Sequence, residues 1–108
     1  MNDLRVLIVD DSETDVFVVL KELNRSFDRV DSARVWTADA LRQELASQAW
    51  DLVISELQLV SLSCTDALEI VRRFDPHLPV IVVSWTLSEE GAVDLVRAGV
   101  NDCVKKQR

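Results

Sequence analysis

The feature that most constrains the fold of this chain is a regular alternation of short apolar runs with segments whose apolar residues recur every three or four positions. Short runs that are apolar throughout are typical of strands buried on both faces of a parallel sheet. Stripes at the longer spacing are typical of helices that cover such a sheet. We therefore expect strands at residues 5–9, 33–36, 52–54, 80–83 and 102–104, with a helix between each consecutive pair.

Hydroxyl residues mark the expected helix starts. A serine or threonine just before a helix can accept a hydrogen bond from an unpaired amide of the first turn. The candidates for this position are Ser12, Thr37, Ser63 and Ser88. The apolar stripes that follow them are Val16, Val19, Leu20, Leu23 and Phe27; Leu41, Leu45 and Ala49; Leu68, Val71 and Phe74; and Val93 and Val96. Gly99 fits the end of the last helix, because glycine accepts the left-handed conformation common there.

The order of these elements predicts an α/β fold: a doubly wound parallel sheet of right-handed βαβ units, with helices on both faces. A chain of 108 residues forms one core, so we expect a single domain over residues 1–108. Trp36 and Trp50 follow apolar segments and are expected to pack in that core. Only residues 105–108 follow the last expected strand, so a fifth helix is expected to be missing or truncated, leaving one sheet face short of cover.

Charge and cysteine content argue against several classes of function. The chain has 12 basic and 19 acidic residues, and a net charge of −7 offers no basic face for the phosphates of nucleic acid. No apolar run approaches the ~20 residues that span a bilayer, so we expect no membrane segment. Cys64 and Cys103 show neither the spacing of a zinc site nor a disulfide framework, and we expect a cytoplasmic protein.

Polar residues gather after the expected strands, at the edge where open parallel sheets bind ligands. They are Asp10 and Asp11 after the first strand, Glu56 after the third, Ser84 at the end of the fourth and Lys106 after the fifth. Clustered carboxylates repel one another unless a cation offsets them, and carboxylate oxygens are ligands that suit Mg²⁺. We therefore predict an Mg²⁺ site that uses Asp10, Asp11 and Glu56 and is coupled to phosphoryl chemistry.

The chain resembles the response-regulator receiver domains of two-component phosphorelay signalling in four segments: LRVLIVDDSETD, DLVISELQL, LPVIVVS and AGVNDCVKK. They occur in the order and spacing of that family, and the resemblance covers essentially the whole chain. It implies a flavodoxin-like (βα)5 fold with strand order 2-1-3-4-5, in which the pair Asp10-Asp11 binds Mg²⁺. It also implies that a partner histidine kinase transfers a phosphoryl group to the residue ending the third strand, where Ser84 and Lys106 sense it.

Several positions depart from the family pattern, among them Val60, Ser61 and Cys64, which stand where the family has Pro-Gly and a later Gly. Glu56 stands where the family has its phosphoaccepting aspartate. One extra methylene displaces the attacking oxygen, so we predict impaired phosphoacceptance and a permanent charge that partly imitates the phosphorylated state. Trp85 replaces a small residue after Ser84, and we expect it to cover the site or to face a partner. Cys103 replaces the switching aromatic residue of the fifth strand.

These patterns predict a receiver-like signalling module that is not an enzyme and acts by binding a protein partner, either a histidine kinase or an output domain. One alternative is a conventional receiver in which Glu56 still accepts a phosphoryl group. Another is a small Mg²⁺-dependent phosphohydrolase that uses the same carboxylates. The uncovered sheet face predicts a homodimer or a longer parent chain.

Each candidate site residue also has a purely structural interpretation. Asp10 and Asp11 could be acidic residues of a turn and helix start. Glu56 and Lys106 could form an ion pair that only stabilises the fold. Ser84 could satisfy backbone groups at a strand end. The positions of the side chains decide between the structural and the functional interpretation of each residue.

Overall fold

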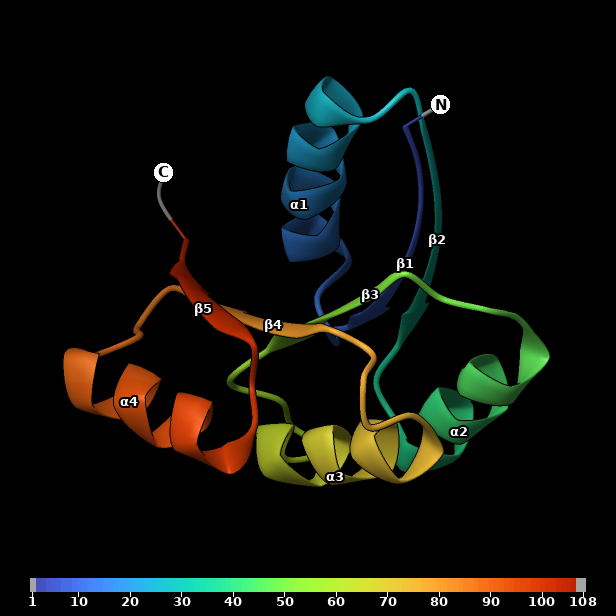
Figure 1. Ribbon diagram of the computed structural model, residues 1–108. Coiled ribbons are helices and arrows are strands. Elements are labelled where there is room, and N and C mark those ends of the chain that lie inside the picture. Colours follow the sequence, from blue (N-terminus) through green and yellow to red (C-terminus); the bar gives the residue numbers. More distant parts are fainter. Residues whose placement is uncertain (1, 107–108) are drawn as a thin grey trace.

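The computed structural model describes residues 2–106, which form a five-stranded parallel sheet with helices on both faces (Figure 1). The strands are β1 (Asp3–Val9), β2 (Arg29–Val35), β3 (Leu52–Glu56), β4 (Val80–Ser84) and β5 (Asp102–Lys105). They lie in the order β2-β1-β3-β4-β5, and every pairing is parallel. The predicted doubly wound, flavodoxin-like sheet with this strand order is confirmed.

The helices in the described residues are α1 (Glu13–Ser26), α2 (Ala38–Ser47), α3 (Cys64–Phe74) and α4 (Glu89–Ala98). Each begins after its predicted hydroxyl residue, whose side chain accepts a hydrogen bond from the amide three positions later. Gly99 ends α4 with a φ of 110°, which a residue with a Cβ rarely adopts. Within residues 2–106 no helix follows β5, as predicted, and none is long and apolar enough to cross a membrane.

Three predicted boundaries of β2 and α2 are wrong. β2 begins at Arg29 rather than at residue 33, because β1 starts as early as Asp3 and the two residues are partners in the parallel ladder. It also ends at Val35, one residue earlier than predicted. α2 ends at Ser47, so Ala49 lies beyond the helix that the apolar spacing assigned it to. Pairing with β1 therefore extends β2 into residues whose own apolar pattern is weak.

The two tryptophans predicted to pack in the core have different environments. Trp50 is buried, and its indole Nε1 donates to the carbonyl oxygen of Glu44 at 2.7 Å. Trp36 is 41% exposed, and the guanidinium carbon of Arg34 lies 4.4 Å from the centre of its ring. The prediction is confirmed for Trp50 and wrong for Trp36, whose strand ends one residue earlier.

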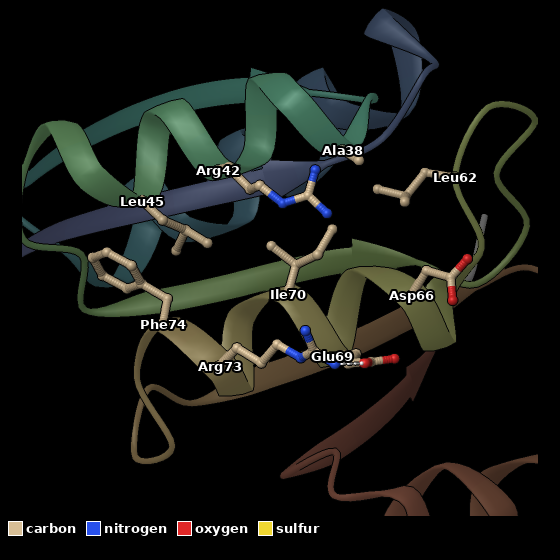
Figure 2. Close-up of a pocket in the computed structure, with 9 residues that line it drawn as sticks. All are labelled: Ala38, Arg42, Leu45, Leu62, Asp66, Glu69, Ile70, Arg73 and Phe74. Carbon is tan, nitrogen blue, oxygen red and sulfur yellow. Dashed lines mark ion pairs between the residues drawn. The ribbon is translucent and has the colours of Figure 1, made fainter.

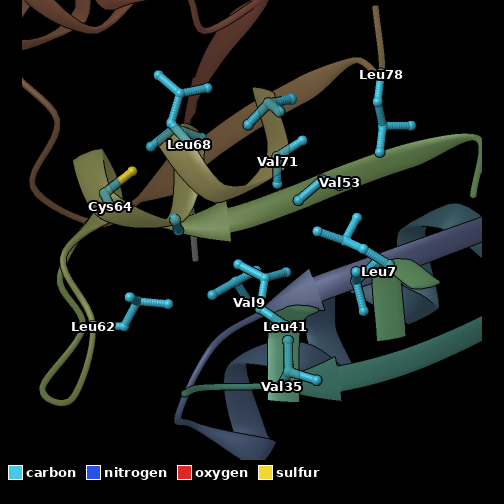
Figure 3. Close-up of a cluster of buried hydrophobic side chains, with 14 of the residues drawn as sticks. Leu7, Val9, Val35, Leu41, Val53, Leu62, Cys64, Leu68, Val71 and Leu78 are labelled. Carbon is cyan, nitrogen blue, oxygen red and sulfur yellow. The ribbon is translucent and has the colours of Figure 1, made fainter. Parts of the chain in front are cut away.

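The larger hydrophobic core lies between the sheet and the helices α2 and α3 (Figure 3). Alternate residues of β1 and one stripe of each helix supply it. Its buried members include Leu7, Val9, Val35, Leu41, Val53, Leu62, Cys64, Leu68, Val71 and Leu78. Full burial of one such aliphatic side chain is worth roughly 1.5–3 kcal/mol. This core therefore holds β1 and β3 side by side and aligns their carboxyl ends.

Within residues 2–106, the opposite face of the sheet is covered by α1 alone (Figure 1). Val6 and Ile8, which alternate with the residues of the larger core, pack there with Val16 of α1. The expectation that one sheet face is short of cover is confirmed for the described residues. Val104 of β5 is 46% exposed and Phe17 of α1 is 69% exposed, so apolar side chains on this side remain in contact with water.

Self-association through this face stays a prediction. We expect a homodimer, because exposed apolar patches often mark surfaces that bind another protein. Val104→Asp should weaken it about tenfold or more, since a charge buried in an apolar interface costs more than ~1.4 kcal/mol. The measurement is the mass from light scattering. Val60→Asp, at a loop position that is 92% exposed, is the control and should not change the mass. A single-chain mass for the unaltered protein would contradict the prediction.

Candidate functional site

Four of the predicted site residues meet at the carboxyl edge of the sheet. Asp10 follows β1, Glu56 is the last residue of β3, Ser84 is the last residue of β4, and Lys106 follows β5. Parallel strands present their carboxyl ends at the same edge, so these residues are close in space although they are far apart in sequence. The Lys106 amide donates to the Ser84 carbonyl oxygen at 2.8 Å, which fixes the chain after β5 beside the end of β4.

The ammonium of Lys106 lies among three carboxylates. Its Nζ is 2.6 Å from Oε2 of Glu56, 3.3 Å from Oδ2 of Asp15 and 3.7 Å from Oδ2 of Asp10. The side chains of Lys106 and Glu56 are 8% and 7% exposed, and that of Asp10 is 2% exposed. Charged hydrogen bonds shielded from water in this way are stronger than surface ion pairs, which water and salt screen. Lys106 is therefore the internal counter-ion of the cluster.

Backbone amides fix the other oxygen of two of these carboxylates. Asp10 Oδ1 accepts the amide of Ser12 at 2.8 Å, and Glu56 Oε1 accepts the amide of Gln58 at 3.4 Å. Each carboxylate therefore has one oxygen on the backbone of its own loop and the other near Lys106. This arrangement orients the second oxygen of each group toward the same small region.

Asp15, which was not predicted, completes the cluster around Lys106. One oxygen from each of the three carboxylates lies within 4.8 Å of the others, close enough for one cation to bridge them. Asp11, which was predicted, is exposed, and its Oδ2 accepts the amide of Val60 at 3.1 Å. Asp15 was missed because an acidic residue in a first helical turn is already explained by the helix dipole. The signal that could have found it is its position in the first turn of the helix that begins just after Asp10 and Asp11, close to the carboxyl end of β1.

Ser84 and Trp85 lie beside the cluster. Ser84 is buried, and its Oγ accepts the amide of Thr86 at 3.2 Å. The half-buried Trp85 donates from Nε1 to Oδ2 of Asp15 at 3.4 Å. The Nζ of Lys106 is 5.6 Å from the centre of the Trp85 ring, within the range of a cation–π contact. The indole thus contacts two members of the charged cluster.

The environment shifts two pKa values of the cluster. Burial raises the pKa of the Asp10 carboxyl above 3.8, and this effect exceeds the opposing ones of the Ser12 amide and Lys106. Burial alone would lower the pKa of Lys106, but the hydrogen bond to Glu56 and the surrounding carboxylates outweigh it and raise the pKa above 10.5. The ammonium is therefore charged at neutral pH.

A separate groove lies between α2 and α3 (Figure 2). Leu45, Ile70 and Phe74 contribute its apolar lining, and Arg73 Nη2 forms an ion pair with Glu69 Oε1 at 2.8 Å beside them. None of the residues that line this groove belongs to the cluster around Lys106. The buried charged groups that could bind a ligand or take part in chemistry lie at the carboxyl ends of the strands instead.

A doubly wound parallel sheet with its charged cluster at the carboxyl edge belongs to the class of α/β proteins that bind ligands at that edge. The chain is a member of the family described as "Response regulator receiver domain", whose sequence model matches residues 6–108. It is thus a receiver domain of two-component signalling, as its resemblance to that family predicts.

Two curated relatives support this assignment. The chain is 33% identical over 109 residues to protein-glutamate methylesterase/protein-glutamine glutaminase 1 of Caulobacter vibrioides, a match that covers 98% of this chain and 31% of that protein. It is 27% identical over 105 residues to chemotaxis protein CheY of Pseudomonas aeruginosa, a match that covers 95% of this chain and 84% of CheY. The chain therefore spans less than a third of the first relative.

A solved structure supports the fold. The receiver domain of the sensor histidine kinase PA1611 from Pseudomonas aeruginosa PAO1 matches with a TM-score of 0.79, over 98% of this chain and 87% of that chain. Its sequence is 19% identical, so this likeness concerns the fold alone. That protein has a magnesium ion coordinated in its active-site cleft.

Removal of the Lys106 charge should destabilise the domain. Breaking a buried ion pair typically costs about 3–5 kcal/mol, and we expect Lys106→Met to lower the free energy of unfolding by this amount at pH 7. Because the folded pKa of Lys106 is raised, its contribution is complete below pH 10.5 and is lost as the pH rises through the folded value. Urea unfolding of both proteins across pH 7–12 checks this prediction. The neighbouring exposed Lys105→Met is the control, and an equal effect of the two substitutions would contradict it.

Neutralising Asp10 should stabilise the domain. The pKa of Asp10 is 3.8 in the unfolded chain and higher in the folded one. The free energy of unfolding therefore falls as the pH rises from 3.8 through the folded pKa, and this loss of stability persists at pH 7. We expect Asp10→Asn to raise the free energy of unfolding by about 1 kcal/mol, a common size for stabilising substitutions. The gain should disappear as the pH falls below 3.8. Urea unfolding in a metal-free buffer measures it, with the exposed Asp11→Asn as the control; a loss of stability in Asp10→Asn would contradict the prediction.

Proposed function

We propose that this receiver domain signals by binding a protein partner and that phosphoryl transfer to Glu56 is impaired. The observation that carries the proposal is the 2.6 Å contact between Glu56 Oε2 and Lys106 Nζ, both on side chains that are nearly buried. A carboxylate that accepts a phosphoryl group must bring an oxygen to within about 3–3.5 Å of phosphorus, in line with the leaving group. The extra methylene of glutamate displaces the oxygen, and the ion pair with Lys106 restrains it, so both oppose that approach.

A permanent charge at Glu56 gives the domain a signalling state without a phosphoryl donor. The carboxylate already holds the lysine at the position that senses the phosphoryl group in the family, so part of the charge arrangement of the phosphorylated state is built in. The proposed partner is a histidine kinase or an output domain, as in the family. A cytoplasmic location is part of the proposal and is supported by the free cysteines Cys64 and Cys103.

The residues of the cluster fit Mg²⁺, the cation that the family implies. Asp10, Asp15 and Glu56 each offer a carboxylate oxygen, and these oxygens are mutually within 4.8 Å. Hard oxygen donors of this kind suit Mg²⁺. We propose these three residues as the groups that would hold the ion, while the role predicted for Asp11 stays a prediction. When bound, Mg²⁺ would supply positive charge that offsets the carboxylates and a phosphoryl group.

The test compares the unaltered chain with Glu56→Asp and Glu56→Gln after incubation with acetyl phosphate and Mg²⁺. Intact mass should reveal no added phosphoryl group on the unaltered chain or on Glu56→Gln. It should reveal one on Glu56→Asp, because the shorter side chain withdraws its oxygen from Lys106 and frees it for attack. We expect the labelled fraction of Glu56→Asp to exceed that of the unaltered chain by about 10²-fold, the cost of a misplacement of ~1 Å.

Each rival function predicts a different experimental result. A phosphoryl group on Glu56 of the unaltered chain would contradict the proposal and identify a conventional receiver. Release of phosphate from a generic ester such as p-nitrophenyl phosphate, abolished by Asp10→Asn, would instead identify a phosphohydrolase. A Mg²⁺ titration followed by beryllofluoride, monitored by the fluorescence of Trp85, should give no response to the phosphate analogue.

A further inference from the structure

A single carboxylate oxygen joins three elements of the fold. Oδ2 of Asp15, in the first turn of α1, accepts from Nε1 of Trp85 at 3.4 Å and lies 3.3 Å from Nζ of Lys106. Trp85 follows β4 and Lys106 follows β5. The two donors are also in contact with each other, since the ammonium is 5.6 Å from the centre of the indole ring. Asp15, Trp85 and Lys106 therefore form a closed triangle of contacts.

The exposed fractions of the side chains show which members of the cluster lie deepest and which lie nearest to solvent. The side chain of Asp10 is 2% exposed, those of Glu56 and Lys106 are 7% and 8% exposed, and that of Asp15 is 25% exposed. Asp15 is therefore the outermost carboxylate, and the half-buried Trp85 lies against it. The ion pair between Lys106 and Glu56 is further inside. A reagent that comes from solvent therefore meets Asp15 before it meets Lys106 or Glu56.

We infer that Asp15 is a positioning residue that latches the indole of Trp85 to the ammonium of Lys106, so that the latch shields the Lys106–Glu56 ion pair until it opens. The latch is an autoinhibitory contact, because a small reagent reaches Lys106 or Glu56 only when one side of the triangle breaks. It goes beyond the proposed function, since it requires no metal, phosphoryl group or partner.

Two independent measurements test the latch in the full chain. The first is the exchange with water of the Trp85 indole N–H, identified by the signal that Trp85→Phe removes. The second is acetylation of Lys106 by acetic anhydride, read by peptide mass spectrometry relative to the exposed neighbour Lys105. In Asp15→Ala both rates should rise about fivefold, the effect of losing a hydrogen bond worth ~1 kcal/mol. Trp85→Ala should raise the acetylation of Lys106 by a similar factor.

Asp15→Asn separates the two sides of the latch. Its amide oxygen can still accept from the indole, but its charge no longer holds the ammonium. We expect acetylation of Lys106 to rise while the indole exchange stays within about twofold of the unaltered chain, as for surface substitutions of small effect. Glu13→Ala is the matched control, because Glu13 is the other acidic residue of the same first turn. It should leave both rates unchanged.

The latch is refuted if Asp15→Ala unfolds cooperatively and leaves both rates within about twofold of the unaltered chain, as a substitution of negligible effect would. Equal changes in Asp15→Ala and Glu13→Ala would also refute it, since they would reflect the helix start and not the contacts of Asp15. If Asp15→Ala does not fold, Asp15→Asn decides. An unchanged reactivity of Lys106 in that variant overturns the inference.

Discussion

The buried ammonium of Lys106 is the interaction on which the site depends. Three carboxylates meet where the strands end, and without a counter-charge their mutual repulsion and loss of hydration would oppose the fold. Lys106 supplies that charge from the residue directly after β5. The same contact therefore stabilises the edge of the sheet and determines which groups the site can use. Under the proposed function, this one side chain would serve both the stability of the fold and the signalling chemistry.

The contacts within the site depend on the length of the Glu56 side chain. Glutamate at position 56 reaches Lys106 with a 2.6 Å contact while its other oxygen accepts a backbone amide. The carboxylate is thus engaged at both oxygens. Trp85 adds a second restraint, because its indole meets both Lys106 and Asp15 at the outer side of the cluster. Two of the departures from the family pattern, Glu56 and Trp85, therefore both contact the ammonium of Lys106.

The fold was predictable because its local signals agree with one another. Ser12, Thr37 and the other hydroxyl residues cap the helices as expected, and Gly99 ends the last one in the left-handed conformation. Apolar runs located all five strands. The start of β2 was not predictable, because Arg29 has no apolar pattern and joins the strand only through pairing with β1. The exposure of Trp36 has the same origin, since it depends on where that pairing stops.

For the site, the sequence alone determined which residues would meet at the sheet edge, because the chain order of strands fixes the residues that follow their carboxyl ends. Asp10, Glu56 and Lys106 were identified in this way. Only the tertiary structure decided that Asp15 rather than Asp11 faces the ammonium. The position of Asp15 depends on the rotation of α1 against the sheet, which is set by packing of its apolar stripe, whereas Asp11 lies before the helix and accepts the amide of Val60. A local pattern of charges contains no information about that rotation.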